Sequence, residues 1–295
     1  MSRKWKFTIN VSKLILPTPA KVNLYLKVLN KRPDGFHNIK TLFERISLQD
    51  EIRLTSNISG KIRITSNHPD VPRGPKNIVY QAAELLRRDF KITHGVDIYI
   101  EKTIPVAAGL AGGSSNGAAV LKGLNQLWKL DLSRLQLTAY GCKLGSDVPF
   151  FLYDTSFAWG TGRGEVVEPV DFKCKLWHVL VVPRMKMHTR NVYQRLNLKL
   201  TNKNDHASIL HRSLENLRLN DIGRWMINDL ETVVFQSAPQ LACLKERLKA
   251  LGSCGAMLSG SGPSVYAVVK TRDQAYAIRE ALAKRYKQVY VVSTL

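Results

Sequence analysis

The sequence has 295 residues, 44% of them hydrophobic, and carries 44 Lys and Arg against 23 Asp and Glu, a formal net charge of +21. A chain of this length and apolar content can form one large domain or two ordinary domains. No apolar run approaches the roughly 18 residues that a membrane span needs, which argues against a membrane partner.

The strong positive charge has two interpretations. It fits a polyanionic partner, or a basic background shared by many proteins of one cell. Aromatic residues make up only 8% of the chain, and no basic run is interleaved with them as stacking on nucleic acid requires. The densest basic region, residues 184–203, fits a solvated face or a surface for a phosphorylated substrate. We therefore expect no specific nucleic-acid partner.

The first 33 residues contain Lys and Arg but no Asp or Glu. They lack an apolar signal-peptide core and are poor in Ser, so we interpret them as a short basic extension that leads into a strand. The four cysteines form no C-x-x-C pair and have no metal-ligand spacing. This favours reduced packing residues in a cytoplasmic protein.

In the first half of the chain, strict alternation predicts a half-buried strand over 22–28, with the Lys21, Asn23 and Tyr25 face turned to solvent. Alternation also predicts a strand over 96–100, and the spacing of apolar residues predicts a helix that follows Asn116. The remaining expected elements are a turn at 33–35, short strands near 52 and 62, a helix over 77–90 capped by Asn77, and a helix over 132–144.

In the second half, a flexible turn at 160–164 precedes a predicted buried strand over 176–182. The other expected elements are helices over 189–196, 229–235, 241–251 and 272–286, and strands over 265–269 and 289–292. Strands and helices that mix without a regular βαβ repeat predict an α+β fold in two domains. We place these domains at 1–160 and 161–295.

A glycine-rich turn joins the predicted strand and helix of the first half. Its residues are Gly109, Gly112, Gly113, Ser114, Ser115 and Asn116. Glycine lets the backbone approach a ligand closely, and Ser or Asn can cap a helix start. Free amides at the positive end of a helix dipole form a ready phosphate site; a plain capped turn is the alternative. The Walker A and G-x-G-x-x-G patterns are absent from this loop, so it is neither a P-loop nor a dinucleotide fingerprint.

Three segments, in this order and spacing, resemble the GHMP kinases: PAKVNL at 19–24, PVAAGLAGGSSNGAA at 105–119 and SGSGP at 259–263. RPDGFH at 32–37 and LGSDVPF at 144–150 resemble the branch of that family that acts on a cytidine-diphosphate-linked alcohol. The resemblance runs from about residue 18 to the end. It implies a ribosomal-protein-like N-terminal domain, a ferredoxin-like C-terminal domain, and ATP-dependent phosphorylation of the 2-hydroxyl of a methylerythritol unit.

The resemblance also implies the catalytic residues. From local sequence alone, Asp147 caps a turn or ends a helix, and Lys21 is a solvent-facing strand residue. By resemblance, Asp147 binds the substrate hydroxyl and takes its proton during phosphoryl transfer. Lys21 pairs with Asp147 and the reacting hydroxyl, and its charge keeps Asp147 ionised. Asn23, on the same strand face, is expected to hold the substrate.

The same resemblance implies a nucleotide site in which loop amides hold the phosphates of ATP and Asn77 and Lys102 line the pocket. The expected set is Asn77, Lys102, Pro105, Gly109, Leu110, Ala111, Gly112, Gly113, Ser114 and Ser115. Ser115 is the better candidate for Mg²⁺ contact, with Ser114 as a helix cap. No second acidic ligand is identifiable, and Mg²⁺ prefers phosphate oxygens and water.

Phe36 and His37 are expected to recognise cytosine by stacking and by a hydrogen bond; an ordinary loop after a turn is the alternative. Gly260 and Gly262 are expected to form a second tight turn at the substrate cleft. Ala111 replaces a glycine of many relatives, a mild change, and Phe36 replaces a tyrosine, which keeps stacking but loses a hydroxyl. The rival interpretations are a GHMP kinase for a small alcohol such as homoserine or mevalonate, and a basic RNA-binding protein.

Overall fold

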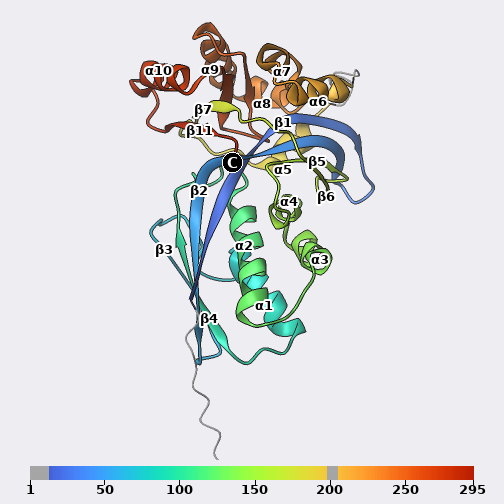
Figure 1. Ribbon diagram of the computed structural model, residues 1–295, viewed down its shortest axis with the longest axis vertical. Helices are drawn as coiled ribbons and strands as arrows, with labels where there is room; N and C mark the ends of the chain where they lie inside the picture. Colours follow the sequence, from blue (N-terminus) through green and yellow to red (C-terminus); the bar gives the residue numbers. More distant parts are fainter. Residues whose placement is uncertain (1–12, 198–204) are drawn as a thin grey trace, which may run out of the picture.

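Two long antiparallel strands, β1 (Lys13–Lys31) and β2 (His37–Asn57), connect the two ends of the molecule. They rise along the lower part of Figure 1 and bend over at the junction with the upper part. The computed structural model describes residues 13–197 and 205–295. Alternating apolar residues form β1 as expected, but the strand is much longer than 22–28 because β2 pairs with it along its whole length.

The first sheet, among the described residues, has seven strands in the order β3-β4-β2-β1-β8, with β5 on β2 and β6 on β5. The second half of β2 pairs with β4 and its first half with β5. Helices α1 and α2 lie along one face, and α3 packs against both of them (Figure 1). The bounds are β3 Ile62–Ser66, α1 Ile78–Asp89, β4 Gly95–Glu101, α2 Gly112–Leu127, α3 Arg134–Leu144, α4 Val148–Leu152, β5 Phe157–Thr161, β6 Val166–Val170 and β8 Ile227–Asn228.

In the part of the chain that the structure describes, the second sheet has four antiparallel strands in the order β11-β7-β10-β9, so their chain order is fourth, first, third, second. This is the arrangement of a ferredoxin-like βαββαβ unit, as expected. Helices pack over it at the top of Figure 1. The bounds are β7 Trp177–Val181, α5 Thr189–Arg195, α6 Ala207–Glu215, α7 Leu219–Trp225, α8 Glu231–Ser237, α9 Pro239–Ala250, β9 Gly255–Leu258, β10 Val265–Val269, α10 Arg272–Ala283 and β11 Val289–Ser293.

The expected α+β class is confirmed, and the expected helices and strands of both halves are present with shifts at their ends. Seven elements among the described residues were not anticipated, because each is short and lacks a long periodic pattern: the helices α4, α6 and α7 and the strands β5, β6, β8 and β9. The division at residues 160 and 161 stays a prediction. It falls at the end of β5, and the β5–β6 hairpin that crosses it belongs to the first sheet.

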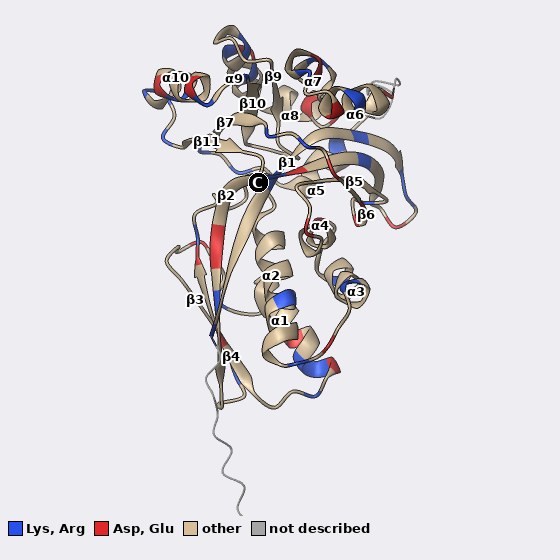
Figure 2. Ribbon diagram, in the orientation of Figure 1, with Lys and Arg blue, Asp and Glu red and all other residues tan. Residues whose placement is uncertain are grey.

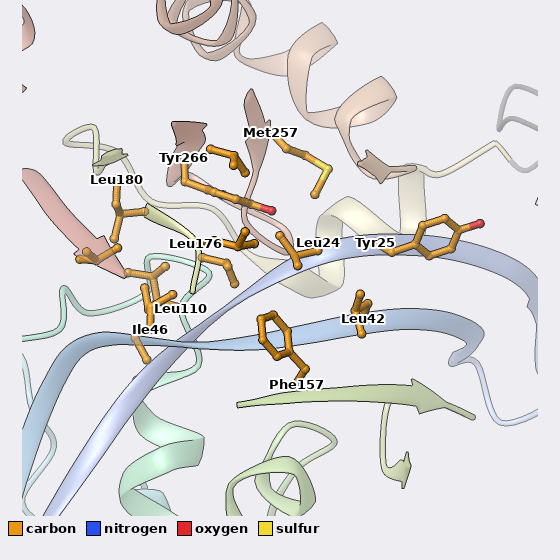
Figure 3. Close-up of a cluster of buried hydrophobic side chains, with 14 of the residues drawn as sticks. Leu24, Tyr25, Leu42, Ile46, Leu110, Phe157, Leu176, Leu180, Met257 and Tyr266 are labelled. Atoms are coloured by element: carbon orange, nitrogen blue, oxygen red, sulfur yellow. The ribbon is translucent and has the colours of Figure 1, made fainter. Parts of the chain in front are cut away.

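Figure 3 shows a cluster of buried side chains in which residues of the two sheets meet. Leu24 and Leu42 come from β1 and β2, and Leu180 and Tyr266 come from β7 and β10. The second sheet therefore covers the upper part of β1. This corrects the expectation of a half-buried strand: Lys21, Asn23 and Tyr25 are buried as fully as the opposite face.

Candidate active site

Two cavities meet at the glycine-rich loop between β4 and α2. The β1 cavity, about 860 Å³, is lined by residues of β1, the turn at 34–37, the loop and α5. The α1 cavity, about 390 Å³, is lined by residues 70–72, the start of α1 and the same loop. Gly109, Ala111 and Ser114 line both cavities. The two cavities therefore adjoin at this loop.

Lys21 and Asp147 lie together at the β1 cavity, which both of them line. Lys21 Nζ is 3.6 Å from Asp147 Oδ2 and donates a 2.7 Å hydrogen bond to Asn23 Oδ1. The ammonium also lies 5.3 Å from the centre of the Phe43 ring. Lys21 is only 4% exposed, so the alternative of a solvent-facing lysine is wrong. A buried cation needs partners of this kind to offset its desolvation.

Asp147 is the N-cap residue of α4, yet its side chain makes no capping hydrogen bond. Its carboxylate is 34% exposed and faces the β1 cavity. Because it is not used by the helix, it can accept a hydrogen bond from a ligand hydroxyl. The structure thus brings Lys21, Asn23 and Asp147 together, as the resemblance implied.

Helix α2 begins at Gly112, five residues before the expected start after Asn116. Its N-cap is Ala111, in the left-handed conformation with φ 54°, and no side chain caps it. The expectation that Ser or Asn caps this helix is wrong, since Ser114, Ser115 and Asn116 are its third, fourth and fifth residues. The first amides of a helix have no intrahelical acceptor. Left uncapped, they can bind an anion at the positive end of the helix dipole.

Gly109 is required by packing. Its φ is +77°, and a Cβ there would lie 2.3 Å from the carbonyl oxygen of Ser259. Ser259 Oγ donates a 3.0 Å hydrogen bond to Gly109 O. The third motif, 259–263, is therefore pressed against the loop, and it turns tightly at Gly260 (φ 54°) and Gly262 (φ 79°), as expected.

The two serines of the loop differ in position. Ser114 lines both cavities. Ser115 is 2% exposed, and its Oγ has no hydrogen-bond partner within the described ranges. Neither cavity has Ser115 in its lining. The choice of Ser115 over Ser114 for a metal contact stays a prediction.

Lys102 lines the α1 cavity and forms a buried ion pair with Asp50 of β2. Burial lowers the pKa of Lys102, and the Asp50 carboxylate opposes this shift. Asp50 Oδ1 also accepts hydrogen bonds from the backbone amides of Thr103 (2.8 Å) and Ile104 (2.7 Å). Asp50 was not anticipated, because it becomes adjacent to the loop only through the pairing of β2 with β4.

Asn77 caps α1, as expected: its Oδ1 accepts a 3.0 Å hydrogen bond from the amide of Val79. Its Nδ2 donates to Pro72 O at 2.6 Å. The residue also lines the α1 cavity, together with Pro105, Leu110, Gly112 and Gly113. The proposed nucleotide residues other than Ser115 are therefore gathered around one hollow.

Phe36 and His37 both line the β1 cavity. Phe36 is 52% exposed, and the guanidinium of Arg163 lies 4.9 Å from the centre of its ring. The His37 ring is buried and lies 5.4 Å from the ring of Tyr193, tilted by 33°. Burial lowers the pKa of His37, and the charge of Lys31 acts in the same direction.

Tyr193, on α5, is a cavity residue that the sequence did not reveal. Burial raises the pKa of its phenol, and the charge of Asp147 adds to that effect. Two aromatic rings and one imidazole thus surround the part of the cavity near the 34–37 turn. In the sequence, Tyr193 is only a tyrosine within an expected helix, residues 189–196. That position does not distinguish it from an ordinary aromatic residue of the core.

Comparison with known proteins places this arrangement in a family. The model of the GHMP kinases N terminal domain matches residues 77–155, and that of the GHMP kinases C terminal domain matches residues 210–288. The 4-diphosphocytidyl-2-C-methyl-D-erythritol kinase of Exiguobacterium sibiricum is 39% identical over 282 residues, 96% of this chain and 98% of that protein. The enzyme of the same name from Bacillus cytotoxicus is 40% identical over 286 residues, 96% and 97% of the two chains.

Solved structures agree. A crystal structure of 4-(cytidine 5'-diphospho)-2C-methyl-D-erythritol kinase superposes with a TM-score of 0.81 at 30% identity, covering 95% of this chain and 98% of that one. Homoserine kinase from Cytophaga hutchinsonii superposes with a TM-score of 0.74 at 19% identity, covering 99% and 97%, and shares the fold. The chain belongs to the GHMP kinases and, within them, to the family of the 4-diphosphocytidyl-2-C-methyl-D-erythritol kinases.

Proposed function

We propose that this protein transfers the γ-phosphate of ATP to the 2-hydroxyl of 4-diphosphocytidyl-2-C-methyl-D-erythritol, in the non-mevalonate route to isoprenoid precursors. The observation that carries the proposal is the meeting of two cavities at Gly109, Ala111 and Ser114, with Lys21 and Asp147 on the β1 side. The names of the relatives, at about 40% identity over nearly the whole chain, support the choice of substrate.

The α1 cavity is the proposed nucleotide site. The uncapped start of α2 provides amides for the phosphates, and Lys102 lies directly against it, 2.9 Å from where a Cβ of Gly112 would stand. Lys102 adds positive charge beside those amides, and Asn77 lines the wall. A phosphate chain bound here ends at the residues shared with the β1 cavity.

The site fits Mg²⁺ bound mainly through phosphate. The described part of the chain has no group of three or more His, Cys, Asp or Glu residues that could hold a metal by themselves. Mg²⁺ keeps several waters and commonly binds through substrate phosphates. Ser114 or Ser115 would supply a hydroxyl ligand. Among the described residues Ser115 Oγ has no hydrogen-bond partner, so this oxygen is available to a bound ion. When bound, the ion neutralises charge on the phosphate oxygens.

The protein's own groups contribute mainly by positioning the reacting atoms. Asp147 accepts a hydrogen bond from the substrate hydroxyl and takes its proton as the bond to phosphorus forms. Lys21 keeps a positive charge beside the reacting oxygen and beside Asp147. An Asp is a weak base near neutral pH. This suffices because phosphoryl transfer depends more on alignment than on early proton removal.

The cytosine end of the substrate is assigned to Phe36, His37 and Tyr193 in the β1 cavity. The exposed face of Phe36 offers stacking, and the largely neutral imidazole of His37 can accept or donate a hydrogen bond. This aromatic end argues against homoserine or mevalonate as the substrate, because neither contains a base to stack.

The proposal also includes the cellular location of the protein and the molecules that it binds. Within residues 13–197 and 205–295, every helix is too short or too polar to cross a bilayer. All four cysteines are unpaired, which fits the reducing cytoplasm. Lys and Arg occur on elements of both domains in Figure 2, which favours general basicity over a nucleic-acid surface. The partners are thus ATP and the cytidine-diphosphate alcohol.

The test is ATP turnover with the cytidine-diphosphate alcohol, homoserine and mevalonate in parallel. The proposal requires ADP release that depends on the cytidine substrate and exceeds that with the other two alcohols. Preference for either small alcohol would reassign the substrate. Absence of turnover with all three, together with tight sequence-selective RNA binding, would favour the RNA-binding alternative.

A further inference from the structure

Lys21 and Asn23 lie at one end of a chain of hydrogen bonds inside the sheet. Each bond in this chain has a fixed donor and a fixed acceptor. Lys21 Nζ donates to Asn23 Oδ1 at 2.7 Å, and Asn23 Nδ2 donates to Thr41 Oγ1 at 2.7 Å. Thr41 Oγ1 in turn donates to the backbone carbonyl of Tyr25 at 2.6 Å. Thr41 is completely buried and lines neither the β1 cavity nor the α1 cavity. Nothing in the proposed reaction uses it directly.

The direction of this chain is forced at both ends. An ammonium can only donate and a carbonyl oxygen can only accept. The Thr41 hydroxyl must therefore donate its single hydrogen to Tyr25 O. Toward Asn23 it can then only accept a hydrogen bond. Asn23 must turn its NH₂ to Thr41 and its oxygen to Lys21. Without the Thr41 hydroxyl, the Asn23 NH₂ loses its acceptor, and of the two groups that orient the amide only the Lys21 ammonium is left.

A bulge in β1 creates the place for this chain. The pairing with β2 shifts between Asn23, opposite Phe43, and Tyr25, opposite Leu42, so Leu24 is the extra residue. Hydroxyls meet the carbonyls on both sides of the bulge. Tyr266 OH of β10 donates to Asn23 O at 2.7 Å, and its ring is visible beside Leu24 in Figure 3. Thr41 is the group on the other side, and bulges commonly re-aim side chains next to active sites.

Asn23 faces Gly260 and the β1 cavity on its remaining side. A Cβ on Gly260 would lie 3.6 Å from Asn23 Oδ1 and 3.7 Å from Lys21 Nζ. The two polar atoms therefore face the 259–263 turn across a gap that a methyl group would fill. The two flipped forms of an amide fill nearly the same volume, so hydrogen bonding decides between them.

We propose that Thr41 is a positioning residue for phosphoryl transfer: it fixes the amide of Asn23, and through Asn23 Oδ1 it holds the Lys21 ammonium beside Asp147. The inference rests on the proposed kinase function, because the quantity that Thr41 affects is the rate of transfer. The α1 cavity and the 34–37 turn lie outside this chain of bonds, so binding of ATP and of the cytosine end should not depend on it.

The experiment compares kcat and the two KM values in the wild type, Thr41→Val and Thr41→Ser. Val has nearly the shape of Thr but lacks the hydroxyl, and Ser keeps it. Loss of one buried hydrogen bond at the transition state predicts a fall in kcat of about tenfold for Thr41→Val, with both KM values within about twofold. Thr41→Ser should recover most of the rate. Thr55→Val, on the same strand and outside both cavities, is the matched control with unchanged kcat.

A double-mutant cycle with Asn23→Ala identifies the route of the effect. Once the amide is gone, Thr41→Val should lower the single-turnover rate no further. Equal losses in the two backgrounds would overturn the proposal, as would wild-type kcat in Thr41→Val. A Thr41→Val protein that does not fold would also overturn it, because Thr41 would then serve the stability of the sheet. Absence of kinase activity in the wild type is a separate result, and it would reject the proposed function itself.

Discussion

Asp147 Oδ2 lies 3.6 Å from Lys21 Nζ, and the two groups come from the start of α4 and the middle of β1. The lysine is buried, while the carboxylate is open to the β1 cavity. One member of the pair is thus held by the protein interior, and the other is presented to a ligand. This asymmetry suits a cation that stabilises charge beside a base that exchanges a proton.

Asp147→Asn should lower kcat by roughly 10²–10⁴, the range for loss of a positioned acid or base, while ATP binding stays nearly unchanged. The fold should persist because the carboxylate makes no capping bond. Steady-state kinetics and nucleotide titration measure the two effects. Asp154→Asn is the control, since Asp154 is exposed and pairs with Lys122. A kcat within a few-fold of the wild type would remove Asp147 from the mechanism.

Gly113→Val should abolish ATP binding in a folded protein. Gly113 lines the α1 cavity, and its Cβ would meet only Ile78 Cγ2, at 3.8 Å, so the larger side chain would extend into space assigned to phosphate. Nucleotide titration beside circular dichroism tests this. Gly74→Val is a control at which a Cβ meets no atom within 4 Å. Normal ATP affinity in folded Gly113→Val would show that the loop is purely structural.

Phe36→Ala should cost the complete substrate far more than a truncated substrate without cytosine. Stacking of a base on an aromatic ring is worth roughly 1–3 kcal/mol, and remote binding energy helps to align the reacting hydroxyl. Loss is therefore expected in both KM and kcat. Phe36→Tyr should retain activity, because the ring is kept. If Phe36→Ala penalises both substrates equally, Phe36 is only a packing residue and the cytosine assignment fails.

His37 should make the protein less stable in mild acid. Burial, with Lys31, holds the pKa of His37 below its ordinary value in the folded state. Its contribution is fully present above the unfolded-state pKa of about 6.5. As pH falls below that value the unfolded chain binds more protons, and the contribution is lost until the pH passes the lower folded-state pKa. Urea unfolding of the wild type and His37→Gln across this window should show a smaller acid loss in the variant. Identical losses would contradict the assignment.

Patterns in short stretches of sequence predicted many of the helices and strands, because these elements depend on residues close together in the chain. The alternation in β4 and the cap of α1 at Asn77 depend on neighbours in sequence, and both are present. The start of α2 was misplaced because Ser114 to Asn116 have the composition of a cap. The helix instead begins at Gly112, behind a strained Ala111, and leaves its amides uncapped.

The site itself depends on contacts that no local pattern contains. Lys21 on an alternating strand resembles a surface residue until the second sheet covers β1. Asp50, Thr41 and Tyr193 become adjacent to the motif residues only through strand pairing and domain packing. Motif resemblance could identify Asp147 and the loop, but the residues that orient them could not be distinguished from ordinary core positions.

Locating the phosphate on the product tests most directly whether this protein phosphorylates the 2-hydroxyl. The protein is incubated with ATP and the cytidine-diphosphate alcohol, and the product is analysed by phosphorus NMR beside a count of ADP formed. We expect one new phosphomonoester on the 2-oxygen for each ADP, and almost none with Asp147→Asn. Phosphate on another oxygen, or ADP formed without a phosphorylated alcohol, would contradict it.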